Sequence, residues 1–475
     1  MADRPNVVLL VLDTARADAF EPYGATAGAS PVVRDMASSG RAVQDVFATS
    51  NWTLPSHASM FTGLLPRELG LGQAPGGRSG ACRPYLERQR HRLLPAVLND
   101  AGYRTRGVSA NLWITSWSGF ATGFDSFNEV TTARNKKVQE SSLRSRAAWA
   151  VEALRANVDD GATAAARVID NWLTTDDAEP FFWFVNLVEC HSPYLPPRPF
   201  SCGGPIDRLR TAHEARKHLT LMGMWGASAG AYEVPEGALD RMRREYAASV
   251  RQVDTWIAQL LDRLDRAGVL DRTLLVVTSD HGENLGESGR LGHAFWLDDR
   301  LVRVPLVTMG PVELATGRVT SLADLPALLA DAAGIADHPW TRTPAGGVAV
   351  ATSDALTDPE DERMLTTREQ YGLDDYAVWR MTTSSTAATD GGLKLVREGD
   401  EDWLYDLALD PLEQIPAHVD GRVVAEHGAR FDRLRAAVDA AHTTSPRVGT
   451  LPSAPTGEAD VPADLEDRMR LLGYL

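Results

Sequence analysis

Shortages of cysteine and of positive charge in this 475-residue sequence exclude several classes of protein. There are only three cysteines (Cys82, Cys190 and Cys202), an odd number that gives neither a disulfide framework nor the spacing of a zinc knuckle. Basic residues are outnumbered, with 48 Lys and Arg against 64 Asp and Glu. The formal net charge of −16 argues against nucleic acid or an anionic membrane surface as a partner. An anionic substrate would need cations gathered locally.

The N-terminal apolar run is also short. Residues 7–12 are all apolar, but six residues are too few to cross a membrane, and no small-residue cleavage site follows them. We therefore expect no membrane anchor and a cytoplasmic protein. The run is instead typical of a buried parallel strand. The sequence leaves the oligomeric state open.

The length allows one large α/β domain with an appendage. We predict this domain over residues 1–340, with helices at 31–37, 93–98 and 238–267 and strands at 7–12, 41–48, 105–110, 181–188 and 274–279. A strand at 304–307 and a helix through 325–329 complete it. Residues 131–180 have a helical pattern, and the glycine-rich residues 198–235 are predicted to form an irregular loop over the site.

A second unit is predicted after a stretch rich in Pro, Thr and Gly at residues 339–347. Short strands at 376–381, 393–396 and 403–407 favour a small antiparallel sheet, followed by a helix at 422–441. We place this smaller C-terminal domain at 348–443. Residues 444–475 are interpreted as a tether and a final short helix.

The stretch around Thr53 has the pattern of a nucleophile beside an anion site. Pro55 suits the first turn of a helix, and Ser56 begins a run of amides at the positive helix end. A hydroxyl in this place becomes a nucleophile if a bound metal lowers its pKa. The alternative is that Thr53 simply caps the helix.

Polar residues follow three buried strands, at the edge where open α/β sheets place functional groups. Asp13 follows the first strand, Glu189 and His191 follow the second, and Asp280 and His281 follow the third. Asp13, Thr53, Asp280 and His281 would give a divalent metal a mixed oxygen and nitrogen shell. Such a shell favours zinc or manganese over calcium or magnesium.

Each of these residues also has an ordinary structural interpretation. A carboxylate after a strand, such as Asp13, is often a helix cap, and the segment 279–282 has the composition of a turn. His191 would then be a loop histidine, and His293 an ordinary surface or packing residue. Several such groups at one inferred sheet edge favour the functional interpretation.

The sequence resembles the sulfatase-like branch of the alkaline phosphatase superfamily. The matching segments are NVVLLVLD at 6–13, TLPSH at 53–57, DHGE at 280–283, VPL at 304–306, LYDL at 404–407 and LLGY at 471–474, with Arg16, Asp18, Thr62, Gly63, Asp410, Pro411 and Glu413. They occur in the family's order over nearly the whole chain. The resemblance implies a large, mostly parallel sheet between helices, a smaller C-terminal antiparallel sheet with a helix, and cleavage or transfer of a phosphate or sulfate ester.

The sequence departs from the formylglycine-dependent sulfatases at the nucleophile and at two metal positions. Those enzymes oxidise a cysteine or serine at the position of Thr53, and a threonine cannot form that aldehyde. Where those enzymes have a pair of acids after the first strand, this sequence has Asp13-Thr14. Where they have Asp-Asn, it has Asp280-His281. These changes resemble the threonine-nucleophile phosphodiesterases, phosphoethanolamine transferases and phosphoglycerol transferases. No formylglycine is therefore expected.

The resemblance also implies roles for the remaining polar residues. His293 resembles a substrate or second-metal histidine of those transferases, and His191 resembles another. Glu189 would join them as a second-metal ligand. Arg16 either braces the site or is an ion-pair partner with a structural role.

Together these features predict a metal-dependent hydrolase or phosphotransferase that uses Thr53 to attack a small phosphate ester or diester. The leading alternative is a sulfatase without formylglycine, acting on sulfate or sulfamate esters. Two further hypotheses are a binding protein on an inactive scaffold and an isomerase similar to cofactor-independent phosphoglycerate mutase.

Overall fold

A large seven-stranded sheet forms the centre of the protein. The computed structural model describes residues 4–71, 82–130, 151, 154–155, 159–175, 180–341, 347–355, 357–419 and 421–443. In spatial order the strands are β2 (Arg41–Ala42), β10 (Leu306–Met309), β7 (Thr273–Thr278), β1 (Asn6–Leu12), β6 (Phe181–Leu187), β4 (Arg104–Ser109) and β5 (Ser126–Glu129). The pairs from β7 to β5 are parallel, and β10 is antiparallel to both of its neighbours.

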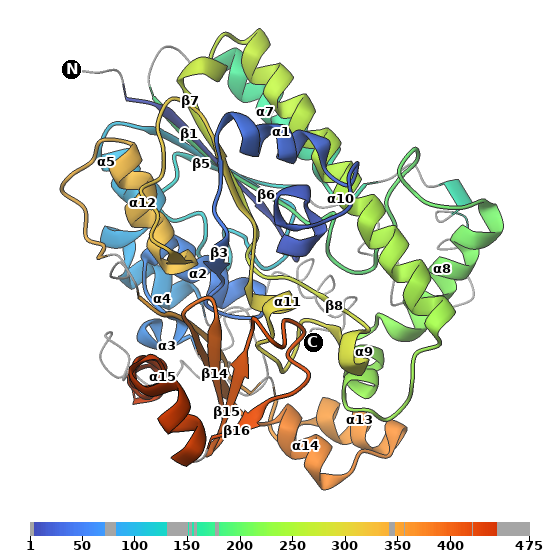
Figure 1. Cartoon of the computed structure of the whole chain (residues 1–475). Coiled ribbons are helices and arrows are strands. Elements are labelled where there is room, and N and C mark those ends of the chain that lie inside the picture. Colours follow the sequence, from blue (N-terminus) through green and yellow to red (C-terminus); the bar gives the residue numbers. More distant parts are fainter. Residues whose placement is uncertain are drawn as a thin grey trace.

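Helices cover both faces of this sheet because its central strands are apolar on both sides. Along β1, Val7 and Leu9 pack against one set of helices, and Val8 and Leu10 pack against the other. The first set is α2 (Thr53–Thr62), α5 (Leu94–Asp100) and α12 (Leu325–Ala332). The second set is α1 (Pro31–Ser39), α7 (Ala162–Thr175) and α10 (Glu236–Arg266). Figure 1 shows the two layers on opposite sides of the strands.

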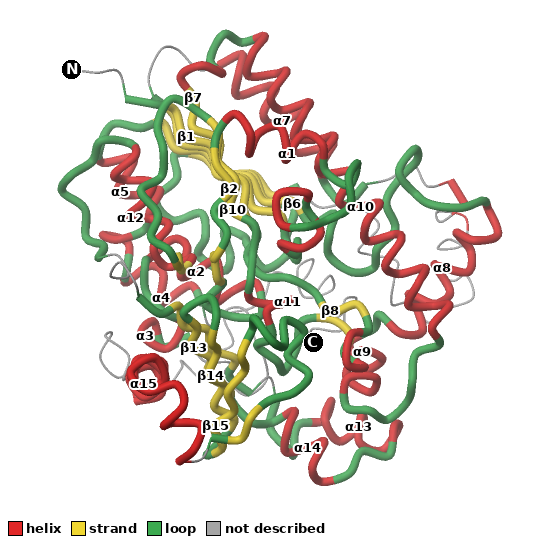
Figure 2. The backbone as a smooth tube through the Cα atoms, in the orientation of Figure 1, coloured by secondary structure: helices red, strands yellow, loops and turns green. Residues whose placement is uncertain are grey.

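A smaller, five-stranded antiparallel sheet lies below the large one (Figure 2). Its strands, in spatial order, are β12 (Ala349–Ser353), β13 (Ser385–Thr389), β14 (Leu393–Glu398), β15 (Glu401–Asp406) and β16 (Ala417–His418). Helix α15 (Gly421–Thr443) packs Phe431, Leu434 and Val438 against one face of this sheet. The predicted fold class is therefore confirmed.

Most of the remaining elements are short. They are β3 (Asp45–Phe47), β8 (Asn284–Leu285), β9 (Leu291–Gly292), β11 (Val319–Ser321), α3 (Pro66–Leu69), α4 (Arg83–Arg88), α8 (Pro205–His218), α9 (Leu221–Ser228), α11 (Asp299–Val302), α13 (Glu362–Tyr371) and α14 (Asp375–Met381). Across the described ranges, no helix is both long and apolar enough to span a bilayer. The domain boundaries at 340 and 348 stay predictions, and the tether and terminal helix predicted at 444–475 lie outside the described residues.

Three element predictions are wrong. Residues 376–381 form helix α14 rather than a strand, because Asp374 caps the helix by accepting a hydrogen bond from the Ala377 amide (2.8 Å). The apolar pair Val378 and Met381 then packs on one helical face. In so short a segment, the apolar residues fit a strand as well as a helix, and their spacing alone does not distinguish the two.

The segment 198–235 contains two helices rather than an irregular loop. Helix α8 begins with Pro205 in its first turn, and helix α9 is capped by the Thr220 hydroxyl, which accepts a hydrogen bond from the Gly223 amide. Gly226 lies inside α9 because a Cβ there would meet the ring of Tyr371 at 2.9 Å. At Gly226 the glycine thus reflects close packing of a helix rather than a loop.

The predicted strand at 41–48 is split between two sheets. Strand β2 pairs with β10 in the large sheet, whereas β3 pairs with β11 in a separate two-stranded sheet. The helical pattern predicted over 131–180 is borne out in its described part by α7, and residues 131–150 lie outside the described residues.

Candidate active site

The parallel register brings the ends of the central strands to one edge of the sheet. Leu12 pairs with Leu187 and Val11 pairs with Thr278, so the residues after β1, β6 and β7 emerge together. Asp13, Asp280 and His281 lie there, fully buried, with potential ligand atoms within 4.8 Å of one another.

A tight turn after β1 holds Asp13 at this edge. Thr14 has a left-handed backbone conformation with φ = 57°, which a β-branched residue adopts only when the surroundings impose it. The Thr14 amide donates a hydrogen bond to Asp280 Oδ1 (3.2 Å). The strained turn thus faces the second carboxylate of the cluster directly.

Thr53 points at the same cluster rather than capping its helix. It is the first residue of α2, preceded by Trp52 in extended conformation, and its Oγ1 lies 3.4 Å from His281 Nε2. The Ser56 hydroxyl donates a hydrogen bond to the Asp280 carbonyl oxygen (2.6 Å), which fixes the helix start against the loop after β7. The Ser56 amide itself is bonded to the Trp52 carbonyl oxygen (3.4 Å) as part of the helix.

The two carboxylates have the electrostatics of a cation site. Asp13 Oδ1 and Asp280 Oδ2 are buried and have no hydrogen-bond donor among the described residues. Burial and the neighbouring Asp280 raise the pKa of Asp13 well above its usual value, although the Asn111 amide opposes this by donating to Asp13 Oδ2. Two adjacent buried anions are costly unless a cation lies between them. The donor set therefore fits a divalent metal.

Two further histidines, His191 and His293, lie beside His281 of this cluster. The ring centroids of His281 and His293 are 4.6 Å apart, and those of His191 and His293 are 5.3 Å apart. Burial lowers the pKa of His281 and of His191. Burial acts on His293 in the same direction, but its Nδ1 lies 3.0 Å from Glu283 Oε1, and this carboxylate raises the pKa of His293 overall.

Glu189 and Arg16 have other partners. Glu189 Oε1 accepts a hydrogen bond from the Ala162 amide at the start of α7 (2.7 Å), and burial raises the pKa of Glu189 to about 8. Its second-metal role stays a prediction. Arg16 forms ion pairs with Asp18 (2.7 Å) and Glu287 (2.6 Å) and donates to the Glu283 carbonyl oxygen (3.2 Å). It thus combines an ion-pair role with a contact beside the site.

Sequence reasoning assigned no role to Asn111, His57 or Glu283. Asn111 follows the end of β4, so the strand-end argument could have found it. The other two lay inside the quoted motifs. His57 Nδ1 lies 3.0 Å from the Thr53 carbonyl oxygen, and its Nε2 lies 3.3 Å from the side-chain amide of Asn186. Burial lowers the pKa of His57, and both contacts fit a neutral ring that donates from Nδ1.

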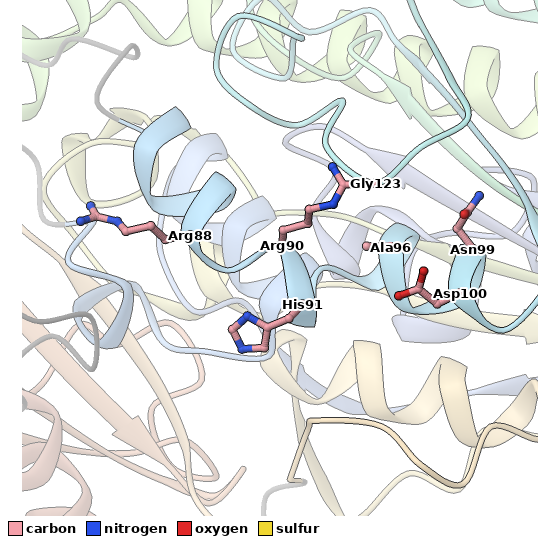
Figure 3. Close-up of a pocket in the computed structure, with 7 residues that line it drawn as sticks. All are labelled: Arg88, Arg90, His91, Ala96, Asn99, Asp100 and Gly123. Carbon is pink, nitrogen blue, oxygen red and sulfur yellow. The ribbon is translucent and has the colours of Figure 1, made fainter.

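A surface pocket of about 400 Å³ lies elsewhere, between α4, α5 and the turn around residue 123. Its lining residues are Arg88, Arg90, His91, Ala96, Asn99, Asp100 and Gly123, none of which belongs to the cluster. In Figure 3, the side chains of Arg88, Arg90 and His91 point in different directions. Its cations therefore do not converge on one point.

Comparison with known proteins decides the family. The family model named Sulfatase matches residues 5–335, a region that contains Thr53 and every residue of the histidine and carboxylate cluster. The chain belongs to the sulfatase family. This confirms the resemblance inferred from the sequence motifs.

Curated relatives of this sulfatase-family protein match over part of their length. It is 34% identical over 189 residues to a choline-sulfatase from Rhizobium meliloti (strain 1021), covering 38% of this chain and 34% of the relative. It is 25% identical over 345 residues to iduronate 2-sulfatase from Mus musculus, covering 65% of this chain and 60% of the relative. The matches thus span about a third and three fifths of these relatives.

Solved structures share the fold over nearly the whole chain. The phosphonate monoester hydrolase of Agrobacterium radiobacter superposes with a TM-score of 0.64 at 21% identity, covering 91% of this chain and 96% of that one. A phosphonate monoester hydrolase from Silicibacter pomeroyi gives a TM-score of 0.63 at 17% identity, covering 93% and 96%. At these identities the likeness establishes the architecture.

Asn111 offers a test of how the cluster is held. Replacing Asn111 by alanine removes the donor to Asp13 Oδ2, and we expect roughly 10–100-fold weaker binding of divalent metal. The measurement is the dissociation constant of the divalent metal, obtained by titration calorimetry. Asn99→Ala is the matched control, because Asn99 donates to Asp125 (2.7 Å) and is outside the cluster. Equal metal affinity for Asn111→Ala and the unsubstituted protein would contradict the assignment.

Proposed function

We propose that this sulfatase-family protein is a metal-dependent hydrolase or phosphotransferase that uses Thr53 to attack a phosphate ester or diester. The observation that supports it best is the 3.4 Å between Thr53 Oγ1 and His281 Nε2, within a buried group that also holds Asp13 and Asp280. A nucleophile and its activating groups must be this close for the chemistry to occur. The substrate is a small molecule, and nothing in the charge balance favours nucleic acid.

The chain's own residues would hold a divalent metal and the substrate. Asp13, Asp280 and His281 are the metal ligands, with Thr53 completing the set, and zinc or manganese fits this donor set better than calcium or magnesium. When bound, the metal lowers the pKa of the threonine hydroxyl and offsets charge on the ester oxygens. Whether one or two ions bind depends on Glu189, His191 and His293, which are the candidates for a second site.

The reaction proceeds by displacement at phosphorus. Thr53 Oγ1 forms a bond to phosphorus and loses its proton to water, while the bond from phosphorus to the leaving oxygen breaks. His293, next to Glu283, supplies a proton to the leaving oxygen, and His191 binds a non-bridging oxygen. Water or an acceptor alcohol then attacks phosphorus and gives its proton to His293, while the bond from phosphorus to Thr53 Oγ1 breaks and this oxygen takes a proton back from water. No step requires formylglycine.

A sulfatase that works without formylglycine is the second candidate. Two observations favour it: the family model is that of sulfatases, and curated relatives are a choline-sulfatase and an iduronate 2-sulfatase. The structural neighbours include phosphonate monoester hydrolases and a glycosaminoglycan sulfatase at similar TM-scores, so they favour neither candidate. A sulfate ester carries less negative charge than a phosphate monoester, so the two substrates would use the same cluster differently.

Release of product from aryl esters separates the two candidates. The protein, stripped of metal and then reloaded with zinc or manganese, is incubated with aryl phosphate, bis-aryl phosphate and aryl sulfate. The proposal expects metal-dependent hydrolysis of a phosphate ester and a phosphate adduct on the peptide containing Thr53 in rapidly quenched samples. Sulfate release alone would support the second candidate. No metal-dependent release from any of the three esters would contradict both.

A further inference from the structure

Lys394 of β14 is a fully buried lysine where the small sheet meets the catalytic part of the chain. Its Nζ lies 2.9 Å from Asp299 Oδ1 in α11 and 2.7 Å from Glu413 Oε1, in the loop that follows β15. Two carboxylates around one buried ammonium form a group in which removing the cation is strongly unfavourable. Lys394 therefore links the small sheet firmly to α11.

The same loop makes further contacts with the start of α11. Glu413 Oε2 accepts a hydrogen bond from the Asp299 amide (2.6 Å), and Arg300 Nη1 donates to the Leu412 carbonyl oxygen (3.0 Å). Leu301 and Val302 of α11 pack into an apolar cluster with residues of the small sheet. A four-residue helix has almost no stability of its own, so these contacts determine its position.

The other end of α11 holds both halves of the candidate active site. The Leu301 carbonyl oxygen accepts a hydrogen bond from the amide of Gly282, the residue after His281 (2.7 Å). The Val302 carbonyl oxygen accepts one from the amide of Ala48, on the segment leading from β3 to Thr53 (2.7 Å). At Gly282 a Cβ would lie 1.9 Å from the Arg300 carbonyl oxygen, so only glycine permits this approach.

The small sheet also binds the segment before Thr53 directly. The Thr352 amide of β12 donates to the Thr49 carbonyl oxygen (2.9 Å), and the Ser50 hydroxyl donates to the Thr352 carbonyl oxygen (2.8 Å). Asn51 donates to the Trp296 carbonyl oxygen (3.0 Å). The path to the nucleophile is thus tied to elements outside the large sheet.

We propose that Lys394 is a positioning residue: through Asp299, Glu413 and α11, the small sheet sets the distance between Thr53 and the Asp280–His281 loop. Without the ammonium group, the buried carboxylate of Glu413 and the part-buried carboxylate of Asp299 would be left facing each other, and α11 would shift or fray. Its hydrogen bonds to Gly282 and Ala48 would then weaken together. The consequence for turnover rests on the proposed function, whereas the consequence for these two amides does not.

The test compares Lys394→Met with a matched control, Arg430→Met. Arg430 forms a two-pronged ion pair with Asp390 (2.6 and 2.7 Å) in the same C-terminal part of the chain, without contacting α11. Amide hydrogen exchange is followed in peptides covering Ala48 and Gly282, at a temperature where circular dichroism shows all variants folded. Metal affinity, kcat and KM are measured on the same preparations.

We expect Lys394→Met to speed exchange of both amides, weaken metal binding by roughly 10-fold or more, and lower kcat more than it changes KM. Arg430→Met should leave all of these near the unsubstituted values. Unchanged exchange at Ala48 and Gly282 in Lys394→Met, or equal changes in both variants, would overturn the proposal. If Lys394→Met does not fold, Glu413→Gln should give a smaller effect in the same direction, and unchanged exchange there would also overturn it.

Failure of the proposed function is distinguishable from failure of this inference. If the unsubstituted protein hydrolyses no phosphate or sulfate ester, the proposed function is lost, but faster exchange of the two amides in Lys394→Met still supports the positioning role. If turnover is present and the exchange is unchanged, the positioning role is lost alone.

Discussion

Thr53→Ala is expected to lower kcat for phosphate ester hydrolysis by roughly 10³- to 10⁶-fold, the range seen when an enzyme loses its nucleophile. The hydroxyl is the atom that lies 3.4 Å from His281 Nε2, and alanine removes it while keeping the helical position. Metal binding through Asp13, Asp280 and His281 should persist, since three ligands remain. The measurements are steady-state kinetics with zinc or manganese and metal content of the same sample.

Two further variants define what the loss means. Thr53→Ser keeps a hydroxyl and should retain part of the turnover. Thr62→Ala is the matched control, because Thr62 is a buried threonine at the other end of α2 whose hydroxyl donates to the Ala58 carbonyl oxygen (2.6 Å) and accepts from the Leu64 amide (3.3 Å). If Thr53→Ala keeps full turnover, Thr53 is not the nucleophile. If the unsubstituted protein shows no turnover and Thr53→Ala binds an ester equally tightly, the binding-protein hypothesis gains support.

The second large effect is expected at Asp280. Asp280→Asn removes one of the two facing carboxylates, so divalent metal should bind more than about 100-fold less tightly. This loss exceeds the usual effect of removing a residue that only supports a ligand. Turnover should fall with it. Metal content by elemental analysis after dialysis and kcat at saturating metal are the measurements.

Thermal stability gives the same variant a test that does not depend on substrate. In the unsubstituted protein, a chelator should lower Tm, because bound metal stabilises the folded state by mass action and its removal leaves two buried carboxylates in contact. In Asp280→Asn the chelator should have little effect, and the metal-free protein should be at least as stable as the metal-free parent, since Asp280 raises the pKa of Asp13. Asp254→Asn is the control, a buried aspartate that accepts hydrogen bonds from the Val32 and Val33 amides. A chelator effect of equal size in Asp280→Asn would place the metal elsewhere.

The predictions that succeeded concern residues whose position follows from the strand to which they belong or which they follow. An all-apolar run such as 7–12 can be buried on both faces only in the middle of a covered sheet, and polar residues after parallel strands must meet at one edge. That is why Asp13, Asp280 and His281 could be grouped before the fold was known. His191 and His293 were named through the resemblance, and the structure brings their ring centroids to within 5.3 Å.

The predictions that failed, and the contacts that were missed, depend on partners distant in sequence. Residues 376–381 are apolar enough for a strand, but Asp374 and the packing of Val378 and Met381 stabilise a helix. Asn111 acquires its role only because β4 lies beside β6 and brings it within reach of Asp13, 98 residues earlier.

The sequence alone determined the fold class, the family and the group of strand-end residues around Thr53, because apolar periodicity and strand-end chemistry are properties of short segments. Only the tertiary structure decided what surrounds that group: the contact of His57 with Asn186 of β6, the Glu283 carboxylate behind His293, and the buried Lys394 that ties α11 to the small sheet. Each of these is a contact between side chains or amides brought together by packing, and such contacts exist only once the chain has folded around them.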